Sequence, residues 1–130
     1  MVDHIFVIDD DAIFRSIVAF ELDDEPAINK VSYYKNGLEG LEALKALKME
    51  EYPEIILLDI NMPVMDGFQF LEAIQGIKLF NPRTKIVILS TTSRSLEIEK
   101  AFNFKHVEAF LEKPFTDQHI SRILKMVAKQ

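Results

Sequence analysis

The sequence predicts an α/β protein with a doubly wound, five-stranded parallel sheet and helices on both faces. Short apolar runs rich in β-branched residues alternate with longer segments whose apolar residues recur every three or four positions, and the pattern of strand then helix occurs five times. Most of the connecting helical segments have about ten or more residues, as crossovers between parallel strands require. The strands also tend to end at polar residues, which predicts one polar edge of the sheet.

The first half of the chain supplies two strands and two helices. The predicted elements are, in order, a strand at 4–8, a helix at 12–24, a strand at 29–34 and a helix around 38–47. Asp10 or Asp11 is expected to cap the first helix, because a carboxylate accepts hydrogen bonds from first-turn amides.

A third strand dominates the middle of the chain. Residues 55–58 form a continuous apolar run, typical of a strand that is buried on both faces, and Asp59 follows directly. Turn-forming residues then lead into a helix over 66–77. Since the carboxyl ends of strands border the ligand crevice in open α/β sheets, Asp59 is placed where chemistry is usually done.

The last part of the chain repeats the pattern twice. The predicted elements are a strand at 85–89, a helix through Leu96 and Phe102, a short strand at 109–111 and a final helix. Thr116 is a plausible N-cap for that helix, whose apolar residues form one stripe.

Composition narrows the class of protein. We expect the 130 residues to form one domain, 1–130, with no output domain after the fifth helix. A net charge of −6 argues against binding to nucleic acid or an anionic membrane. The absence of Cys excludes thiol catalysis, and the chain shows neither a secretory leader nor an apolar run of membrane-spanning length. We therefore expect a cytoplasmic protein.

Four strand tips converge on one edge of the predicted sheet. They carry Asp9 and Asp10, Asp59, Ser90, and Lys113. Two carboxylates roughly 5 Å apart repel each other by about 3 kcal/mol at an effective dielectric of 20, so a hard cation such as Mg²⁺ is expected among them. A carboxylate nucleophile beside a metal, an ammonium and a hydroxyl is equipped to accept a phosphoryl group.

Four motifs connect this chain with a known family. They are Ile8-Asp9-Asp10, the run LDINMPVMDG from Leu58 to Gly67, Leu89-Ser90 and Lys113-Pro114-Phe115. On these motifs the chain resembles the receiver domain of bacterial two-component response regulators, of the single-domain chemotaxis-regulator type. The resemblance implies a flavodoxin-like fold with strand order 2-1-3-4-5.

The resemblance also implies a phosphoacceptor and a metal site. Asp59 would be the phosphoacceptor. Asp10 and Asp59 would bind Mg²⁺ through side-chain oxygens, Asn61 through its backbone carbonyl, and Asp9 through a water.

Further roles follow from the same resemblance. Ser90 would hydrogen-bond the phosphoryl group and Lys113 would pair with it, while the bond from Lys113 to Pro114 would be cis. Ser90 and Phe110 would form the switch that responds to phosphorylation. Asn61 and Thr92 would tune hydrolysis of the phosphorylated form, which we expect to be slow to moderate.

The leading functional hypothesis is a stand-alone receiver. A histidine kinase or a histidine phosphotransfer protein would donate to Asp59, and the modified domain would change its affinity for an unidentified protein target. Its role would be signalling and not enzymatic turnover, although it would catalyse its own phosphorylation and dephosphorylation. The alternative is an interaction module of the same fold that works without phosphate.

Two other classes fit less well. Phosphatases of the haloacid dehalogenase type use a second Asp two residues after the nucleophile, where this chain has Asn61. A flavodoxin needs a phosphate-binding loop after its first strand, where Asp9, Asp10 and Asp11 would repel a flavin phosphate.

Several aromatic and aliphatic residues from Phe102 to Phe110 are either core or an exposed docking face.

Overall fold

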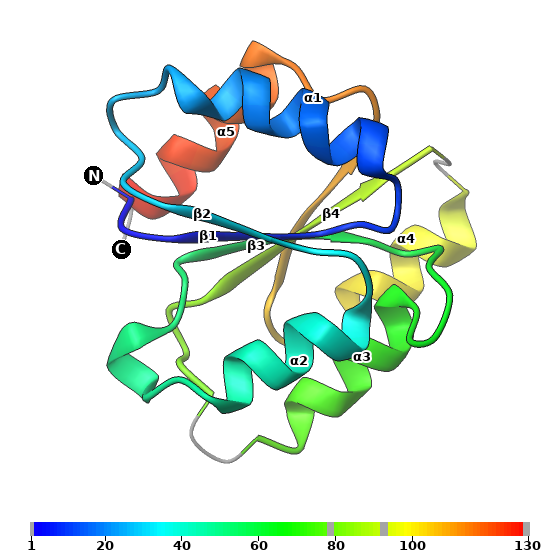
Figure 1. The fold of residues 1–130 in the computed structure, drawn as a ribbon. Coiled ribbons are helices and arrows are strands. Elements are labelled where there is room, and N and C mark those ends of the chain that lie inside the picture. The colour runs from blue at the N-terminus through cyan, green and yellow to red at the C-terminus, as the bar shows by residue number, and fades with distance from the viewer. Residues whose placement is uncertain (1, 78–79, 92–93, 129–130) are drawn as a thin grey trace.

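The computed structural model describes residues 2–77, 80–91 and 94–128. Five parallel strands pair in the order β2-β1-β3-β4-β5, which confirms the predicted fold and strand order. Helices α1 and α5 cover one face of the sheet, and α2, α3 and α4 cover the other (Figure 1). In order, the elements are β1 (Ile5–Ile8), α1 (Ala12–Asp23), β2 (Val31–Tyr34), α2 (Gly37–Lys45), the 3₁₀ turn η1 (Met49–Glu51), β3 (Ile55–Asp59), α3 (Gly67–Gln75), β4 (Lys85–Ser90), α4 (Ser95–Phe102), β5 (Val107–Glu112) and α5 (Asp117–Ala128).

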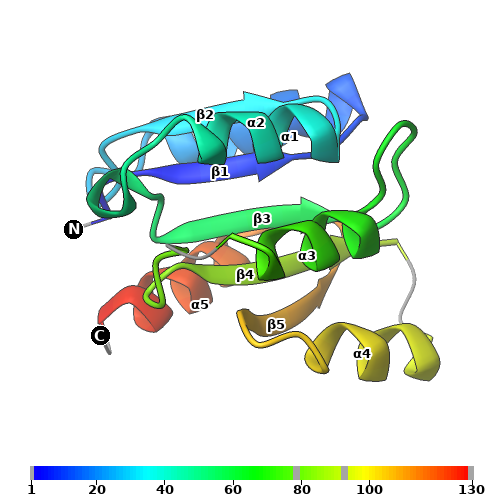
Figure 2. The ribbon, with the colours of Figure 1, turned by 90° about the horizontal axis from the view of Figure 1, so that it is seen from below.

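The strands lie side by side and point the same way, so their carboxyl ends share one edge (Figure 2). In β1 and β3 the odd-numbered apolar residues pack with α1 and α5, and the even-numbered ones pack with α2, α3 and α4. This alternation is the pleat of a strand buried on both faces. By the same alternation, Asp9 and Asp59 lie on the side that α1 and α5 cover.

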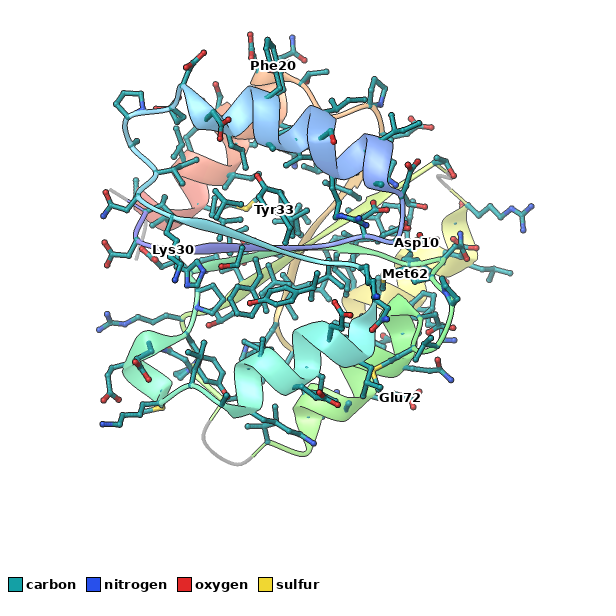
Figure 3. All side chains as sticks on the ribbon, viewed as in Figure 1. Asp10, Phe20, Lys30, Tyr33, Met62 and Glu72 are labelled. Carbon is teal, nitrogen blue, oxygen red and sulfur yellow. The ribbon has the colours of Figure 1, made fainter. Side chains whose placement is uncertain are left out.

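Helix α1 carries two apolar rows, and only one of them faces the sheet. The buried row is Phe14, Val18 and Leu22. The exposed row is Ile13, Ile17 and Phe20, with exposed fractions of 73%, 44% and 75%. Figure 3 shows Phe20 pointing away from the sheet. Both rows have helical spacing, so periodicity predicts the helix but not which row is buried.

Most element boundaries agree with the prediction, and the differences have local causes. Strand β5 begins at Val107 and not at residue 109, because it pairs with β4 through an irregularity between Ile86 and Val87. The charged residue Glu108 interrupts the apolar pattern, so the sequence does not predict this part of the strand. The Glu108 carboxylate pairs with Lys85, with 3.5 Å between Oε1 and Nζ. The turn η1 was not predicted from the sequence.

Helix α3 begins at Gly67 because Asp66 is its N-cap. The Asp66 carboxylate accepts a hydrogen bond from the Gln69 amide, and the Gln69 side chain accepts one from the Asp66 amide. These reciprocal bonds satisfy amides that a helix start leaves without partners. Within the described residues, no helix has both the length and the apolar character needed to cross a membrane.

Candidate functional site

The predicted convergence of strand tips is confirmed. Pairing of Ile8 with Leu58 brings the ends of β1 and β3 level, so that Asp9 and Asp59 are neighbours. Ser90 ends β4, and its carbonyl accepts a hydrogen bond from the Lys113 amide at 2.8 Å. Lys113 thereby enters the same edge directly after β5.

Three carboxylates gather at this edge. Asp9, Asp10 and Asp59 each offer one oxygen atom, and these atoms lie within 4.8 Å of one another. Asp9 and Asp59 are buried, with 2% and 7% of their surface exposed, whereas Asp10 is open to solvent. Figure 3 shows Asp10 at the end of the sheet opposite Lys30. The arrangement concentrates negative charge at a place where only one of the three carboxylates is open to water.

Lys113 is the cation that contacts these carboxylate groups among the described residues. Its Nζ atom lies 2.8 Å from Asp9 Oδ2 and 3.8 Å from Asp59 Oδ1. The same atom lies 4.0 Å from the centre of the Phe14 ring. One ammonium faces three carboxylates, so the cluster retains an excess of negative charge.

The electrostatics of Asp59 follow from this crowding. Burial, reinforced by the nearby charge of Asp9, raises the pKa of the Asp59 carboxyl from 3.8 to about 6. Lys113 and a hydrogen bond from the Ile60 amide act in the opposite direction but are outweighed. The fold therefore holds this carboxylate at a free-energy cost, as functional sites often do.

The loop after β1 fixes Asp9 and separates the roles of its neighbours. Asp11 is the N-cap of α1, accepting hydrogen bonds from the amides of Ile13 and Phe14. The Asp11 amide in turn donates to Asp9 Oδ1 at 2.9 Å, and Arg15 Nη1 donates to the Asp9 carbonyl at 2.7 Å. Because Asp11 caps the helix, Asp10 is left to the carboxylate cluster.

A close backbone approach holds the loop after β3. A Cβ atom on Gly67 would lie 2.6 Å from the carbonyl oxygen of Asp59 and 2.8 Å from the Cα of Ile60. The Gly67 amide also donates to the Ile60 carbonyl at 2.8 Å. Only a residue without a side chain allows α3 to start this close to the strand tip.

The same loop contains a strained residue. Val64 has φ of 70°, in the left-handed region that β-branched residues rarely adopt, and 74% of its surface is exposed. Such a conformation costs on the order of 1–3 kcal/mol and persists only where its surroundings enforce it.

The remaining predicted residues are distributed as follows. Ser90 is fully buried, Asn61 is exposed, and Phe110 is half-buried against the core on the α2, α3 and α4 side. The bond from Lys113 to Pro114 is cis, as predicted. Thr92 lies outside the described residues.

The aromatic residues near β5 do not form one exposed face. Phe102 on α4 is 48% exposed, whereas Val107 is buried in the core and Phe104 packs against it. Both interpretations of this group thus hold in part, residue by residue.

Two residues of the site were missed by sequence reasoning. Phe14 was read only as part of an amphipathic helix, and Arg15 was not singled out. Phe14 contacts Lys113, which is far away in the sequence, and Arg15 contacts the Asp9 carbonyl across the turn before α1. Local spacing in the sequence does not reveal such contacts.

The donor set fits a hard divalent cation. Carboxylate oxygens are the ligands that Mg²⁺ prefers, and a site with one or two carboxylates plus water and phosphate oxygens suits its octahedral shell. Asp9, Asp10 and Asp59 supply such oxygens within 4.8 Å of one another and carry the excess charge that a cation would balance.

Comparison with known proteins identifies the family. The model of the response regulator receiver domain matches residues 5–125, and the chain therefore belongs to this family. A protein-glutamate methylesterase/protein-glutamine glutaminase of Methanospirillum hungatei is 36% identical over 119 residues, which are 92% of this chain and 33% of that protein. The chain thus spans about a third of the length of the curated relatives it matches.

Solved structures support the same fold. A two-component response regulator from Cytophaga hutchinsonii has a TM-score of 0.89 at 22% identity, covering 99% of this chain and 98% of that one. The chemotaxis response regulator CheY4 of Vibrio cholerae has a TM-score of 0.79 at 25% identity, covering 98% of this chain and 99% of that one.

Proposed function

We propose that this receiver domain accepts a phosphoryl group on Asp59 and signals through the resulting change in a partner-binding face. The observation that carries the proposal is the buried Asp59 carboxylate, which lies 3.8 Å from the Lys113 ammonium and shares its site with two further carboxylates. One edge of the sheet thus carries an acceptor carboxylate, a cation and a cluster of acidic residues suited to a metal ion.

The metal in this proposal is Mg²⁺. Asp10 and Asp59 would bind it through side-chain oxygens, Asn61 through its backbone carbonyl, and Asp9 through a water. When bound, the ion supplies positive charge that balances the carboxylates and the transferring phosphoryl oxygens. The closeness of the three carboxylates, with oxygen atoms within 4.8 Å of one another, supports this assignment.

The chemistry of this chain is nucleophilic attack. An oxygen of Asp59 forms a bond to phosphorus as the bond from phosphorus to the donor's histidine nitrogen breaks, and the imidazole keeps the electron pair. Lys113 stabilises negative charge on the phosphoryl oxygens, and the Ser90 hydroxyl donates a hydrogen bond to one of them. The donor would be a histidine kinase or a histidine phosphotransfer protein.

The output would be a change of shape and not turnover of a substrate. Ser90 would move toward the phosphoryl group and Phe110 would turn inward, so that the surface near β5 binds a downstream protein differently. Phe110 has no hydroxyl, so this switch depends on packing alone. The stand-alone arrangement without an output domain, the cytoplasmic location and slow to moderate self-hydrolysis stay predictions.

Intact-mass measurement tests the proposal. We expect the purified protein to gain one phosphoryl group from acetyl phosphate in the presence of Mg²⁺, because that donor releases acetate with the electron pair of the broken bond. Omission of Mg²⁺ or the substitution Asp59→Asn should abolish the gain. A folded protein that gains no phosphoryl group from acetyl phosphate or from a phosphohistidine donor would favour the phosphate-independent interaction module.

A further inference from the structure

We propose that Phe14 is the positioning residue of Lys113, holding the ammonium over its ring so that it can move from Asp9 to the phosphoryl group. The inference rests on the proposed function and adds a residue on α1 to the site. It follows from the contacts of Lys113 Nζ and from the way Phe14 is fixed.

The ammonium of Lys113 has three close neighbours among the described residues. Asp9 Oδ2 lies at 2.8 Å, Asp59 Oδ1 at 3.8 Å and the centre of the Phe14 ring at 4.0 Å. Only 13% of the Lys113 side chain is exposed, so little water remains to solvate the charge. The ring therefore replaces water on one side of the ammonium.

Phe14 is itself held firmly. Its side chain is 7% exposed and packs in the core beneath α1 and α5 with Val18 and Phe115. Its amide donates to the Asp11 carboxylate in the capped first turn of α1. The ring is thus held by the capped start of α1 and by the core, in addition to its contact with Lys113.

An aromatic ring suits this place better than an aliphatic side chain. The negative face of the ring attracts a cation without accepting a strong N–H hydrogen bond, so all three donors of the ammonium stay available. Lys113 can then exchange its hydrogen bond to Asp9 for one to a phosphoryl oxygen while it remains over the ring. A leucine would leave the charge against an apolar surface with nothing to replace its lost solvation.

A second contact of the same kind provides a matched control. Lys100 Nζ on α4 lies 4.2 Å from the centre of the Phe68 ring on α3. Lys100 is exposed, and neither residue of this pair contacts Asp9 or Asp59 in any interaction described above. Phe68→Leu therefore removes the same type of contact without altering the environment of Lys113.

The test compares initial rates of phosphorylation by acetyl phosphate at saturating Mg²⁺, normalised to the folded fraction. We expect Phe14→Leu to be about three- to tenfold slower than wild type, the range that corresponds to a partly desolvated cation–π contact. Phe14→Tyr should restore most of the rate, and Phe68→Leu should match wild type. In a Lys113→Met background, Phe14→Leu should have no further effect.

A spectroscopic signature accompanies the rates. In wild type without phosphate, the Lys113 ε-methylene protons should show an upfield ring-current shift that Phe14→Leu loses and Phe14→Tyr keeps. If Phe14→Leu fails to fold, Phe14→Met takes its place, because it fills a similar volume without a ring.

Several results would overturn the inference. It fails if Phe14→Leu reacts as fast as wild type, or if its slowing is the same in the Lys113→Met background, which would indicate a general packing effect. It also fails if Phe14→Tyr is as slow as Phe14→Leu while equally folded. If the wild-type protein itself gains no phosphoryl group, the proposed function is wrong, and the inference that rests on it is wrong too.

Discussion

The two edges of the sheet use carboxylates in opposite ways. At the amino edge, the Glu54 carboxylate accepts hydrogen bonds from the amides of Asp3 and His4 at 3.0 to 3.2 Å. At the carboxyl edge, Asp59 is buried beside two further carboxylates, and its pKa is raised to about 6. One carboxylate fastens the chain at the start of β1, and the other destabilises the fold that holds it.

This comparison distinguishes a carboxylate with a structural role, Glu54, from one with a proposed functional role, Asp59. Backbone amides satisfy the hydrogen-bonding oxygens of Glu54 within the protein, so this carboxylate is held in place without a cation. The carboxyl edge has one ammonium for three carboxylates, and Mg²⁺ or a phosphoryl group alters its balance directly. Three experiments test the site and the loop at the carboxyl edge.

The largest effect is expected from Lys113→Met. Removing a charged group that stabilises a transferring phosphoryl group should slow phosphorylation by acetyl phosphate on the order of 100-fold. Glu54→Gln at the opposite edge should leave the rate unchanged, since among the described residues the Glu54 carboxylate bonds to backbone amides just before β1, far from the site. Comparable slowing of both variants would mean that the rate follows general stability and not the site.

A second effect concerns stability against pH. Because the folded-state pKa of Asp59 is about 6, above its ordinary value of 3.8, the folded state binds this proton more tightly than the unfolded state. The contribution of Asp59 to the free energy of unfolding should therefore fall as pH rises from 4 to 6, by up to about 3 kcal/mol, and stay low above pH 6. Urea unfolding of wild type and Asp59→Asn without metal should show this difference.

Added Mg²⁺ provides the control for the pH experiment. It should recover stability in wild type above pH 6, where the Asp59 carboxyl is mostly ionised, and should do so much less in Asp59→Asn. Identical pH profiles for the two proteins would contradict the burial argument for Asp59.

The smallest effect is expected at Val64. Val64→Gly should raise the free energy of unfolding by about 1 kcal/mol, because glycine adopts positive φ without the clash of a branched side chain. Val127→Gly within α5 should instead lower it by about 1 kcal/mol or more, because it removes a side chain that packs against the core and places glycine in a helix. Thermal unfolding distinguishes these outcomes, and destabilisation by Val64→Gly would show that the loop needs the valine side chain.

The sequence predicted the fold because its strands are short, apolar and clearly separated. It predicted the convergence of Asp9, Asp59, Ser90 and Lys113 because each follows or ends a strand, and parallel strands end at one edge. The face of α1 that is buried could not be predicted, since two rows share the same spacing and only packing chooses between them.

Contacts between distant segments account for the rest. The ring of Phe14 meets Lys113 across most of the chain, and the positive φ of Val64 is imposed by the loop and not favoured by its own side chain. Neither the contact nor the positive φ can be predicted from a local pattern in the sequence. Distances between the strand tips and the charge balance that they create likewise require coordinates.

The absent side chain of Gly67 sets a limit on how this domain can evolve. Helix α3 rests on the backbone of the strand tip so closely that one added methyl group would displace either the helix or Asp59. Among all single substitutions, those at position 67 should thus be nearly as poorly tolerated as those at position 59. Position 59 is constrained by the chemistry of its carboxylate, and position 67 by the lack of room for a side chain.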